Sequence, residues 1–287
     1  MKVKKAIIPA AGMGTRVLPA SKAVPKEMLN IVDKPAIQYI VEEAVAAGIE
    51  DILIITNRGK GVIEDHFDLE TNLKDNASKQ HIYEELKAIA NLANVYFIRQ
   101  KETKGLADAI LRAKSFVGNE PFGILYGDDV ILSEDPVIGQ LCRAYEEFGF
   151  GAVGVKEVPR EDVPKYCTLD VTPLRDNIMK CNNIIEKPTP DQIMSCYSIL
   201  GRVVMPPEIF GIIEQTPVDK KSGEVYFTDS MVTLAKQSGL TAVDFVGTRY
   251  DMGNKLGIMK ANCEVALTHP EIGADFKAYL QELVRTF

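Results

Sequence analysis

The sequence predicts a Rossmann-like α/β fold of three layers, in which one mixed, mainly parallel sheet lies between two layers of helices. Short apolar runs such as 51–56 alternate with amphipathic segments such as 36–47 through the first half of the chain. A short run without polar alternation is typical of a strand buried on both faces. Strands that alternate with helices are joined by right-handed crossovers and therefore lie parallel.

The elements of the first half follow from this alternation and from turn residues. Residues 5–9 predict the first buried strand. Pro35 stands where the first position of a helix would be, and Gly48 would end that helix in a left-handed conformation. Further strands are expected at 51–56, 95–99 and 122–126, and further helices at 60–67, 79–92, 106–116 and 137–148, the last ending at Gly149.

After Gly151 the regular alternation of strands and helices ends, because several strand-like runs follow one another with few helices between them. Strands are expected at 151–158, 168–171, 181–187, 197–204 and 241–246, and helices at 207–215, 227–238, 254–268 and 271–285. The chain has no internal repeat and no evident linker. We therefore expect a single domain over 1–287, with two halves that meet near residue 150.

The composition excludes several classes of protein. The 287 residues are 46% hydrophobic and 25% charged, as in an ordinary globular protein, and the formal net charge of −7 argues against nucleic-acid binding. The five cysteines are scattered and odd in number, which indicates reduced thiols. There is no apolar stretch of the roughly 18 residues that a membrane span needs. We expect a cytoplasmic protein that binds neither nucleic acid nor membrane.

The first strand ends in a loop that could hold a polyphosphate. Small side chains allow backbone N–H groups to approach a phosphate closely, and Arg16 and Lys26 add positive charge. Glycines in turns are commonly structural, so a lone Gly-x-Gly is a weak signal. Val17 stands where the dinucleotide fingerprint needs a small residue, and the Walker A pattern is absent. The other residues of this loop that we select are Ala10, Ala11, Gly12, Gly14 and Thr15.

Two aspartates follow strand-like runs and are candidate ligands for Mg²⁺. Asp128 lies in Tyr-Gly-Asp-Asp after the run 122–125, and Asp251 lies in Arg-Tyr-Asp-Met-Gly-Asn-Lys. The ligand crevice of an open α/β sheet lies beyond the carboxyl ends of its strands, and Mg²⁺ prefers hard oxygen ligands shared with phosphates. Either aspartate could instead be a turn or helix-cap residue.

The pair Glu186–Lys187 ends another predicted strand. The carboxylate could accept hydrogen bonds from sugar hydroxyls and the ammonium could hold a sugar phosphate, although an ordinary surface ion pair is the alternative. Only three histidines occur, without metal-ligand spacing, and there is no Gly-x-Ser-x-Gly motif. A reaction without a protein nucleophile is favoured, and direct nucleotidyl transfer is one.

Together these motifs resemble the sugar-nucleotide pyrophosphorylases, in particular the bacterial UTP–glucose-1-phosphate uridylyltransferases. The likeness extends over nearly the whole chain. It includes Ile-Ile-Pro-Ala-Ala-Gly-Met-Gly-Thr-Arg, Pro-Lys-Glu-Met-Leu, Tyr-Gly-Asp-Asp, Ile-Glu-Lys-Pro and Arg-Tyr-Asp-Met-Gly-Asn-Lys-Leu-Gly, in the family's order.

The resemblance implies a Mg²⁺-dependent enzyme that acts on UTP and glucose 1-phosphate and forms a homodimer or homotetramer. Residues of about 1–150 would bind the nucleotide, and those of about 151–287 the sugar phosphate, with the C-terminal helices used for oligomerisation. The implied roles are nucleotide binding for Ala10, Ala11, Gly12, Gly14, Thr15, Gln100 and Gly105, catalysis for Arg16, Lys26, Asp128 and Lys187, metal binding for Asp128 and Asp251, and sugar-phosphate binding for Cys167, Glu186, Lys187 and Gly201.

Four positions depart from the family's pattern, mostly on the sugar side. They are Ala107, Cys167, Val203 and Tyr226. The Cys167 side chain could crowd the sugar pocket, and Ala107 would add a methyl group near the base. Two alternatives therefore remain: a nucleotidylyltransferase that uses dTTP or another hexose 1-phosphate, and a non-catalytic regulatory relative that binds UDP-glucose.

Overall fold

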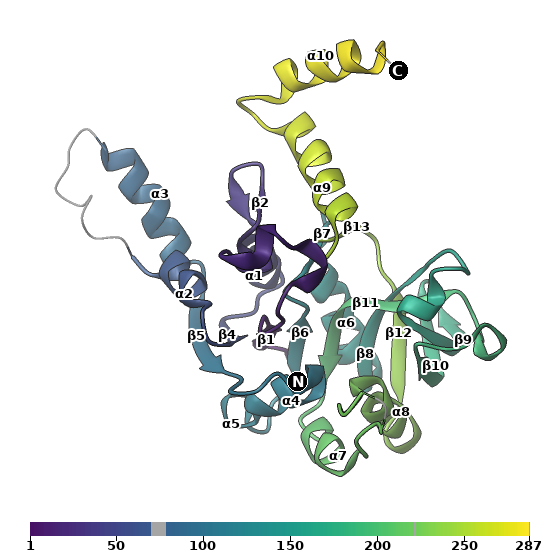
Figure 1. The fold of residues 1–287 in the computed structure, drawn as a ribbon. Helices are drawn as coiled ribbons and strands as arrows, with labels where there is room; N and C mark the ends of the chain where they lie inside the picture. Colours follow the sequence, from purple (N-terminus) through teal and green to yellow (C-terminus); the bar gives the residue numbers. More distant parts are fainter. Residues whose placement is uncertain (70–78, 221, 287) are drawn as a thin grey trace.

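A computed structural model describes residues 1–69, 79–220 and 222–286. Within these ranges a nine-stranded sheet has the order β5-β4-β1-β6-β11-β8-β12-β10-β9 (Figure 1). Only β11 and β10 run against the other strands, so the predicted mixed, mainly parallel sheet is confirmed. Its strands are β1 (Lys5–Pro9), β4 (Asp51–Thr56), β5 (Asn94–Arg99), β6 (Phe122–Leu125), β8 (Gly151–Glu157), β9 (Cys167–Arg175), β10 (Ile178–Glu186), β11 (Tyr197–Met205) and β12 (Leu240–Asp244).

Helices cover both faces of this sheet. Alternate residues of a strand point to opposite faces, so Ile8 of β1 packs into one apolar cluster and Ile7 into another. The first cluster takes most of its helical members from α1 (Ala36–Ala46), α2 (Gly61–Phe67) and α6 (Val137–Phe148). The second takes most of them from α4 (Gly105–Arg112), α7 (Ile209–Gln215) and α8 (Phe227–Gln237).

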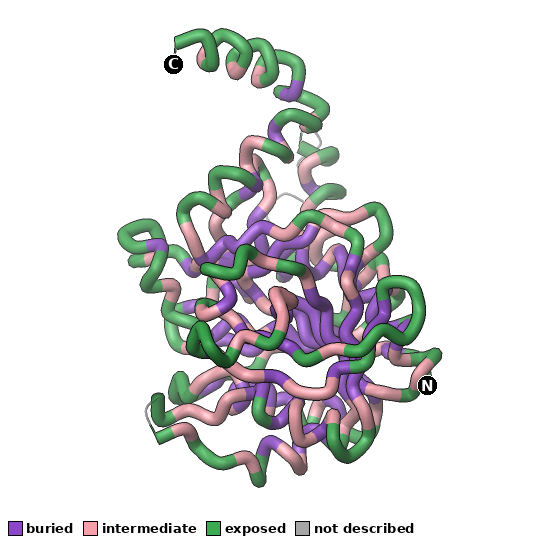
Figure 2. The backbone as a smooth tube through the Cα atoms, turned by 90° about the vertical axis from the view of Figure 1, so that its right-hand side faces the viewer, coloured by how far each residue is buried: buried purple, intermediate pink, exposed green. Residues whose placement is uncertain are grey.

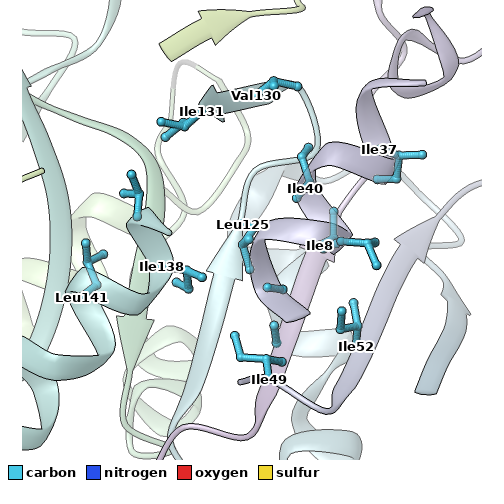
Figure 3. Packing of buried hydrophobic residues seen from close by; sticks show 14 of the residues in the cluster. Ile8, Ile37, Ile40, Ile49, Ile52, Leu125, Val130, Ile131, Ile138 and Leu141 are labelled. Atoms are coloured by element: carbon cyan, nitrogen blue, oxygen red, sulfur yellow. The ribbon is translucent and has the colours of Figure 1, made fainter. Parts of the chain in front are cut away.

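The first cluster shows why the early strands are uninterrupted apolar runs. In Figure 3, Ile37 and Ile40 of α1 face Ile8 of β1 and Leu125 of β6. The tube in Figure 2 shows that buried residues concentrate in the central sheet. The three layers predicted from the sequence are therefore present.

Two small ribbons of strands were not predicted. β7 (Asp129–Leu132) pairs with β13 (Thr248–Asp251), and β2 (Asn30–Ile31) pairs with β3 (Lys34–Pro35). The prediction that Pro35 is the first helical residue was wrong: it precedes α1 with an extended backbone, because it belongs to this second hairpin. The expected helix over 106–116 is divided into α4 and α5 (Lys114–Val117), because the N–H of Ala113 turns back to the Ile110 carbonyl, at 2.9 Å.

The remaining helices are α3 (Gln80–Ala90), α9 (Lys255–Thr268) and α10 (Gly273–Val284). α10 meets α9 at the turn between them, where Gly273 lies against Leu267, and both helices project away from the sheet (Figure 1). In the described part of the chain, no helix combines the length and apolar character that crossing a membrane requires.

Candidate active site

The candidate residues gather at one edge of the sheet. β1, β4, β5 and β6 are parallel, so their carboxyl ends meet there. The glycine loop follows β1, Gln100 follows β5, and Asp128 follows β6. The edge of the sheet thus brings together residues far apart in sequence, as expected for an open α/β fold.

The glycine loop lies close to its neighbours, and at Gly14 a side chain would be strained. Gly14 has a φ of 64°, and a Cβ on it would lie 3.1 Å from the Ser21 Cβ. The Ser21 hydroxyl donates to the Gly14 carbonyl at 2.6 Å. A Cβ on Gly12 would lie 3.7 Å from the Lys26 Nζ, so this part of the loop lies directly beside Lys26. Ala10 and Ala11 are buried, while Gly12 and Thr15 are exposed.

Two cations and two carboxylates meet beside this loop. Lys26 forms an ion pair with Asp128. The Arg16 Nη2 lies 3.8 Å from the Asp128 Oδ2, and the Arg16 Nη1 lies 3.6 Å from the Asp251 Oδ2. Burial acts to raise the pKa of Asp128, but the charges of Lys26 and Arg16 outweigh it and hold this pKa below its ordinary value. Asp128 is therefore an ionised carboxylate at neutral pH.

Gly253 marks the point where these groups converge. Its N–H donates to the Asp251 Oδ1 at 2.7 Å. A Cβ at this position would lie 2.7 Å from that oxygen and 3.1 Å from the Asp128 Oδ2. The Met252 N–H donates to the Asp128 carbonyl at 2.8 Å, which fixes the two aspartates relative to each other.

The neighbouring Asp129 has a different partner. Its Oδ1 lies 2.6 Å from the Arg249 Nη2, and both side chains are mostly buried. Burial raises the pKa of Asp129 to about 6, against the opposing charge of Arg249. Gly201 has a φ of 73°, and a Cβ there would lie 2.8 Å from the Asp129 Cβ. Gly201, selected for the sugar side, thus packs against Asp129.

A cavity of about 230 Å³ lies beyond this cluster. Its walls include Tyr126, Tyr166, Cys167, Glu186, Lys187 and Tyr226. The predicted sugar-side residues other than Gly201 therefore share one cavity. It is large enough for a small polar ligand, and its lining includes the carboxylates of Glu186 and Glu224 and the ammonium groups of Lys165 and Lys187.

Lys187 has an unusual backbone in this wall. Its φ is 44°, in the left-handed region that residues other than glycine seldom occupy. Its N–H donates to the Tyr166 carbonyl at 2.8 Å, and its Nζ lies 5.5 Å from the centre of the Tyr226 ring. Burial raises the pKa of Glu186, while Lys187 opposes this shift. Backbone outliers of this kind often occur at functional sites.

Three of the four departures from the family's pattern, Ala107, Cys167 and Val203, are buried residues. Ala107 and Val203 are fully buried in the second apolar cluster. The Cys167 thiol is 3% exposed and accepts the Ile199 N–H at 3.4 Å, and burial raises its pKa to about 12. Its sulfur is therefore held against β11. Tyr226, by contrast, faces Lys187 in the cavity wall.

Gln100 and Gly105 also lie together. The Gln100 Nε2 donates to the Gly105 carbonyl at 3.1 Å and to the Asp108 Oδ2 at 2.8 Å. Gly105 has a φ of 87°, and a Cβ there would lie 2.7 Å from the Glu224 Oε2. Glu224 lines the sugar-side cavity as well, so it connects the two groups of predicted residues.

Sequence reasoning missed Asn57, Lys60 and Arg249. Asn57 and Lys60 follow β4 at the edge of the sheet where Asp128 follows β6. Because ligands of an open α/β fold bind beyond the carboxyl ends of its strands, the place of these two residues in the sequence could have identified them. Arg249 had no such signal, because the β7–β13 pairing that brings it to Asp129 is long-range.

A family model described as nucleotidyl transferase matches residues 5–267 of the chain. The chain belongs to this nucleotidyl transferase family. The resemblance based on the motifs is thus confirmed.

Among curated relatives of this nucleotidyl transferase, the UTP–glucose-1-phosphate uridylyltransferase of Staphylococcus epidermidis is 47% identical over 285 residues, covering 98% of this chain and 99% of the relative. The UTP–glucose-1-phosphate uridylyltransferase YngB of Bacillus subtilis is 46% identical over 289 residues, covering 99% of this chain and 96% of the relative. A UTP-bound UGPase from Acinetobacter baumannii superposes with a TM-score of 0.89 at 35% identity, over 98% of this chain and 99% of the other.

Proposed function

We propose that this protein transfers a uridylyl group from UTP to glucose 1-phosphate, forming UDP-glucose and pyrophosphate. The convergence of Arg16, Lys26, Asp128 and Asp251 beside a cavity that holds Glu186 and Lys187 carries this proposal. It agrees with the names of relatives that match nearly the whole chain. The free thiols within the described chain fit a reducing cytoplasm, where we place the reaction.

The reaction needs no nucleophile from the protein. A phosphate oxygen of glucose 1-phosphate forms a bond to the α-phosphorus of UTP, and the bond from that phosphorus to the oxygen bridging the β-phosphate breaks. The attacking phosphate is already ionised at neutral pH, so no base has to remove a proton. The protein therefore has to position two anions and stabilise the charge that moves onto pyrophosphate.

The residues have the chemistry for these tasks. We assign the triphosphate to Arg16 and Lys26, and the sugar phosphate to Lys187. The Arg16 side chain is 66% exposed, so it is accessible to a ligand. Glu186 would accept hydrogen bonds from sugar hydroxyls, and Cys167 would contribute its backbone. The glycine loop with Thr15, together with Gln100 and Gly105, would hold the nucleoside and its phosphates.

A divalent cation fits the paired aspartates. Within the described ranges no group of three or more His, Cys, Asp or Glu side chains surrounds a common point, but Asp128 and Asp251 converge at Gly253. Two carboxylates are the hard oxygen donors that Mg²⁺ takes, with phosphate oxygens and water completing its shell. Mg²⁺ held there would offset the negative charge of both phosphate groups.

Pyrophosphate release tests this proposal. UTP and dTTP are offered with glucose 1-phosphate and galactose 1-phosphate, with Mg²⁺ or with excess chelator. We expect the highest kcat/KM for UTP with glucose 1-phosphate, and no turnover with chelator. A protein that binds UDP-glucose but releases no pyrophosphate with any pair would contradict the proposal, and a preference for dTTP or galactose 1-phosphate would reassign its substrates.

The Asp128→Asn variant tests the role of the carboxylate cluster. Because Asp128 meets both cations and lies beside Asp251, its loss should reduce kcat by at least about 100-fold. Asp170→Asn on the exposed part of β9 is the matched control and should keep wild-type turnover. Near-wild-type kcat in Asp128→Asn would remove Asp128 from the mechanism.

A further inference from the structure

Two side chains from the segment after β4 hold the glycine loop through its carbonyl groups. The Lys60 Nζ donates to the Ala10 carbonyl, and the Asn57 Nδ2 donates to the Ala11 carbonyl. Both acceptors belong to the loop that follows β1. The segment 57–60 therefore fixes two successive peptide groups of that loop.

The direction of these carbonyls determines the direction of the next N–H groups. In a trans peptide the carbonyl of one residue and the N–H of the next point in opposite directions. The N–H groups of Ala11 and Gly12 therefore point away from Lys60 and Asn57. Among the described residues, neither N–H donates to a protein acceptor, and Gly12 is exposed beside Lys26. Two unpaired donors thus remain for a ligand at this loop.

Lys60 also joins the loop to the segment that carries Lys26. Its Nζ lies 2.8 Å from the Glu27 Oε2, and the side chains are 7% and 1% exposed. Glu27 directly follows Lys26 in the chain. The other Glu27 oxygen is buried without a hydrogen-bond partner, so Lys60 is the main compensation for this carboxylate. A buried ion pair of this kind is costly to desolvate and is weak evidence for a purely stabilising role.

We propose that Lys60 is a positioning residue for the nucleotide, and that Asn57 has the same task one peptide later. By holding the Ala10 carbonyl, Lys60 keeps the Ala11 N–H directed at the bound nucleotide, and through Glu27 it keeps Lys26 in place beside that loop. This inference rests on the proposed binding of UTP at the glycine loop. Neither residue contacts the reacting atoms.

The test separates positioning from stability. Lys60→Met alone leaves Glu27 buried and unpaired and is expected to unfold the protein, so the double variant Lys60→Met/Glu27→Met is used. Two apolar side chains of similar length should preserve the fold, but the Ala10 carbonyl loses its donor. We expect the Kd for UTP, measured by calorimetric titration without sugar, to rise about tenfold or more. The KM for glucose 1-phosphate at saturating UTP should change less than about twofold.

The control is Lys34→Met/Glu42→Met. It removes the ion pair between Lys34 of β3 and Glu42 of α1, in which the Nζ and Oε2 atoms are 2.7 Å apart. It should leave both constants unchanged. A folded Lys60→Met/Glu27→Met protein that binds UTP with wild-type affinity would overturn the inference. So would an equal loss of affinity for both substrates, because that indicates a general structural effect.

If the double variant does not fold, Asn57→Ala tests the inference in its place. Asn57 is only half-buried, so the protein should fold, and the Kd for UTP should rise by about threefold to tenfold because the Ala11 carbonyl is released. Asn91→Ala is the control. The Asn91 Nδ2 also donates to a backbone carbonyl, that of Lys87 at 2.6 Å, but this carbonyl belongs to α3. Unchanged UTP affinity in Asn57→Ala would refute the inference. Failure of the wild-type protein to bind UTP would instead refute the proposed function.

Discussion

Asp128 and Asp129 are adjacent in the chain but have opposite environments. Asp128 faces Lys26 and Arg16, which lower its pKa against the effect of burial. Asp129 is the first residue of β7, and burial raises its pKa to about 6 beside Arg249. The step from loop to strand turns the two side chains apart. One carboxylate is therefore available to a cation, while the other fixes the ribbon that carries Asp251.

Glu186 gives a prediction for pH dependence. Burial raises its pKa above the ordinary value, so its carboxylate is protonated at a higher pH than that of a free glutamate. As the pH falls through this value, the side chain loses its negative charge and part of its capacity to accept hydrogen bonds from the sugar, and the KM for glucose 1-phosphate should rise. Glu186→Gln should have a higher KM at neutral pH and lack this acid limb. The measurement is the ratio of the KM of Glu186→Gln to the KM of the wild-type protein, followed against pH, because the ionisation of the substrate affects both values equally. A ratio that stays constant would contradict the role of Glu186 in sugar binding.

The burial of the cysteines predicts which thiols an alkylating reagent reaches first. Burial raises the pKa of Cys142, Cys167 and Cys181 to about 12, so these thiols remain protonated and covered at pH 8. Cys196 and Cys263 are only partly buried. We expect native protein to alkylate first at Cys196 and Cys263, as mass spectrometry of digested peptides would show. Rapid labelling of Cys167 would mean that its thiol faces the cavity and not β11.

Among the elements, α1 and β11 are joined by a buried ion pair. Arg202 is fully buried, and its Nη2 lies 2.6 Å from the Glu43 Oε2. The Glu43 Oε1 also accepts the Ile138 N–H at the start of α6, at 2.9 Å. Two helices and one strand thus share a single charged centre within the core.

Removing one partner of this pair should be costly. Arg202→Met leaves Glu43 buried without its counter-charge, and the free energy of unfolding should fall by about 3–5 kcal/mol in urea titrations. The double variant Arg202→Met/Glu43→Leu removes both charges and should recover most of this loss. If the double variant were as unstable as the single one, lost packing and not an unpaired charge would explain the effect.

The sequence could predict elements whose signals are local. Val137–Phe148 has the expected bounds, because Pro136 precedes it and Gly149 adopts a φ of 69° after it. β7 and β13 could not be predicted, because each is short and is defined by a partner more than 100 residues away. The candidate site shows the same division: Asp128 and Lys187 lie in recognisable motifs, whereas Lys60 and Arg249 act through residues that only the fold brings near.

For the whole molecule, the projecting C-terminal helices suggest association between copies. We propose a homo-oligomer, because Gly273 alone is buried among the residues of α10, whereas Tyr279 and Val284 of this helix are 56% and 64% exposed. The two helices extend away from the sheet (Figure 1). Apolar side chains in such an arm are typical of an interface.

Light scattering after size-exclusion chromatography tests this association. The wild-type protein should have the mass of a dimer or tetramer. Tyr279→Glu/Val284→Glu should shift it toward the monomer, because charges at an interface are costly to bury. Lys277→Glu, on the same helix, serves as a comparison for a change of charge alone. A wild-type monomer would refute the proposed association.

In the proposed reaction the two anionic substrates react with each other at the edge of the sheet, with no covalent intermediate on the protein. The stereochemistry at phosphorus distinguishes this single displacement from a route through such an intermediate. One diastereomer of UTP with sulfur on the α-phosphorus is converted with glucose 1-phosphate, and the configuration of the product is determined by phosphorus NMR. A single in-line displacement predicts inversion. Retention would require two displacements through a uridylylated side chain and would contradict a direct reaction between the substrates.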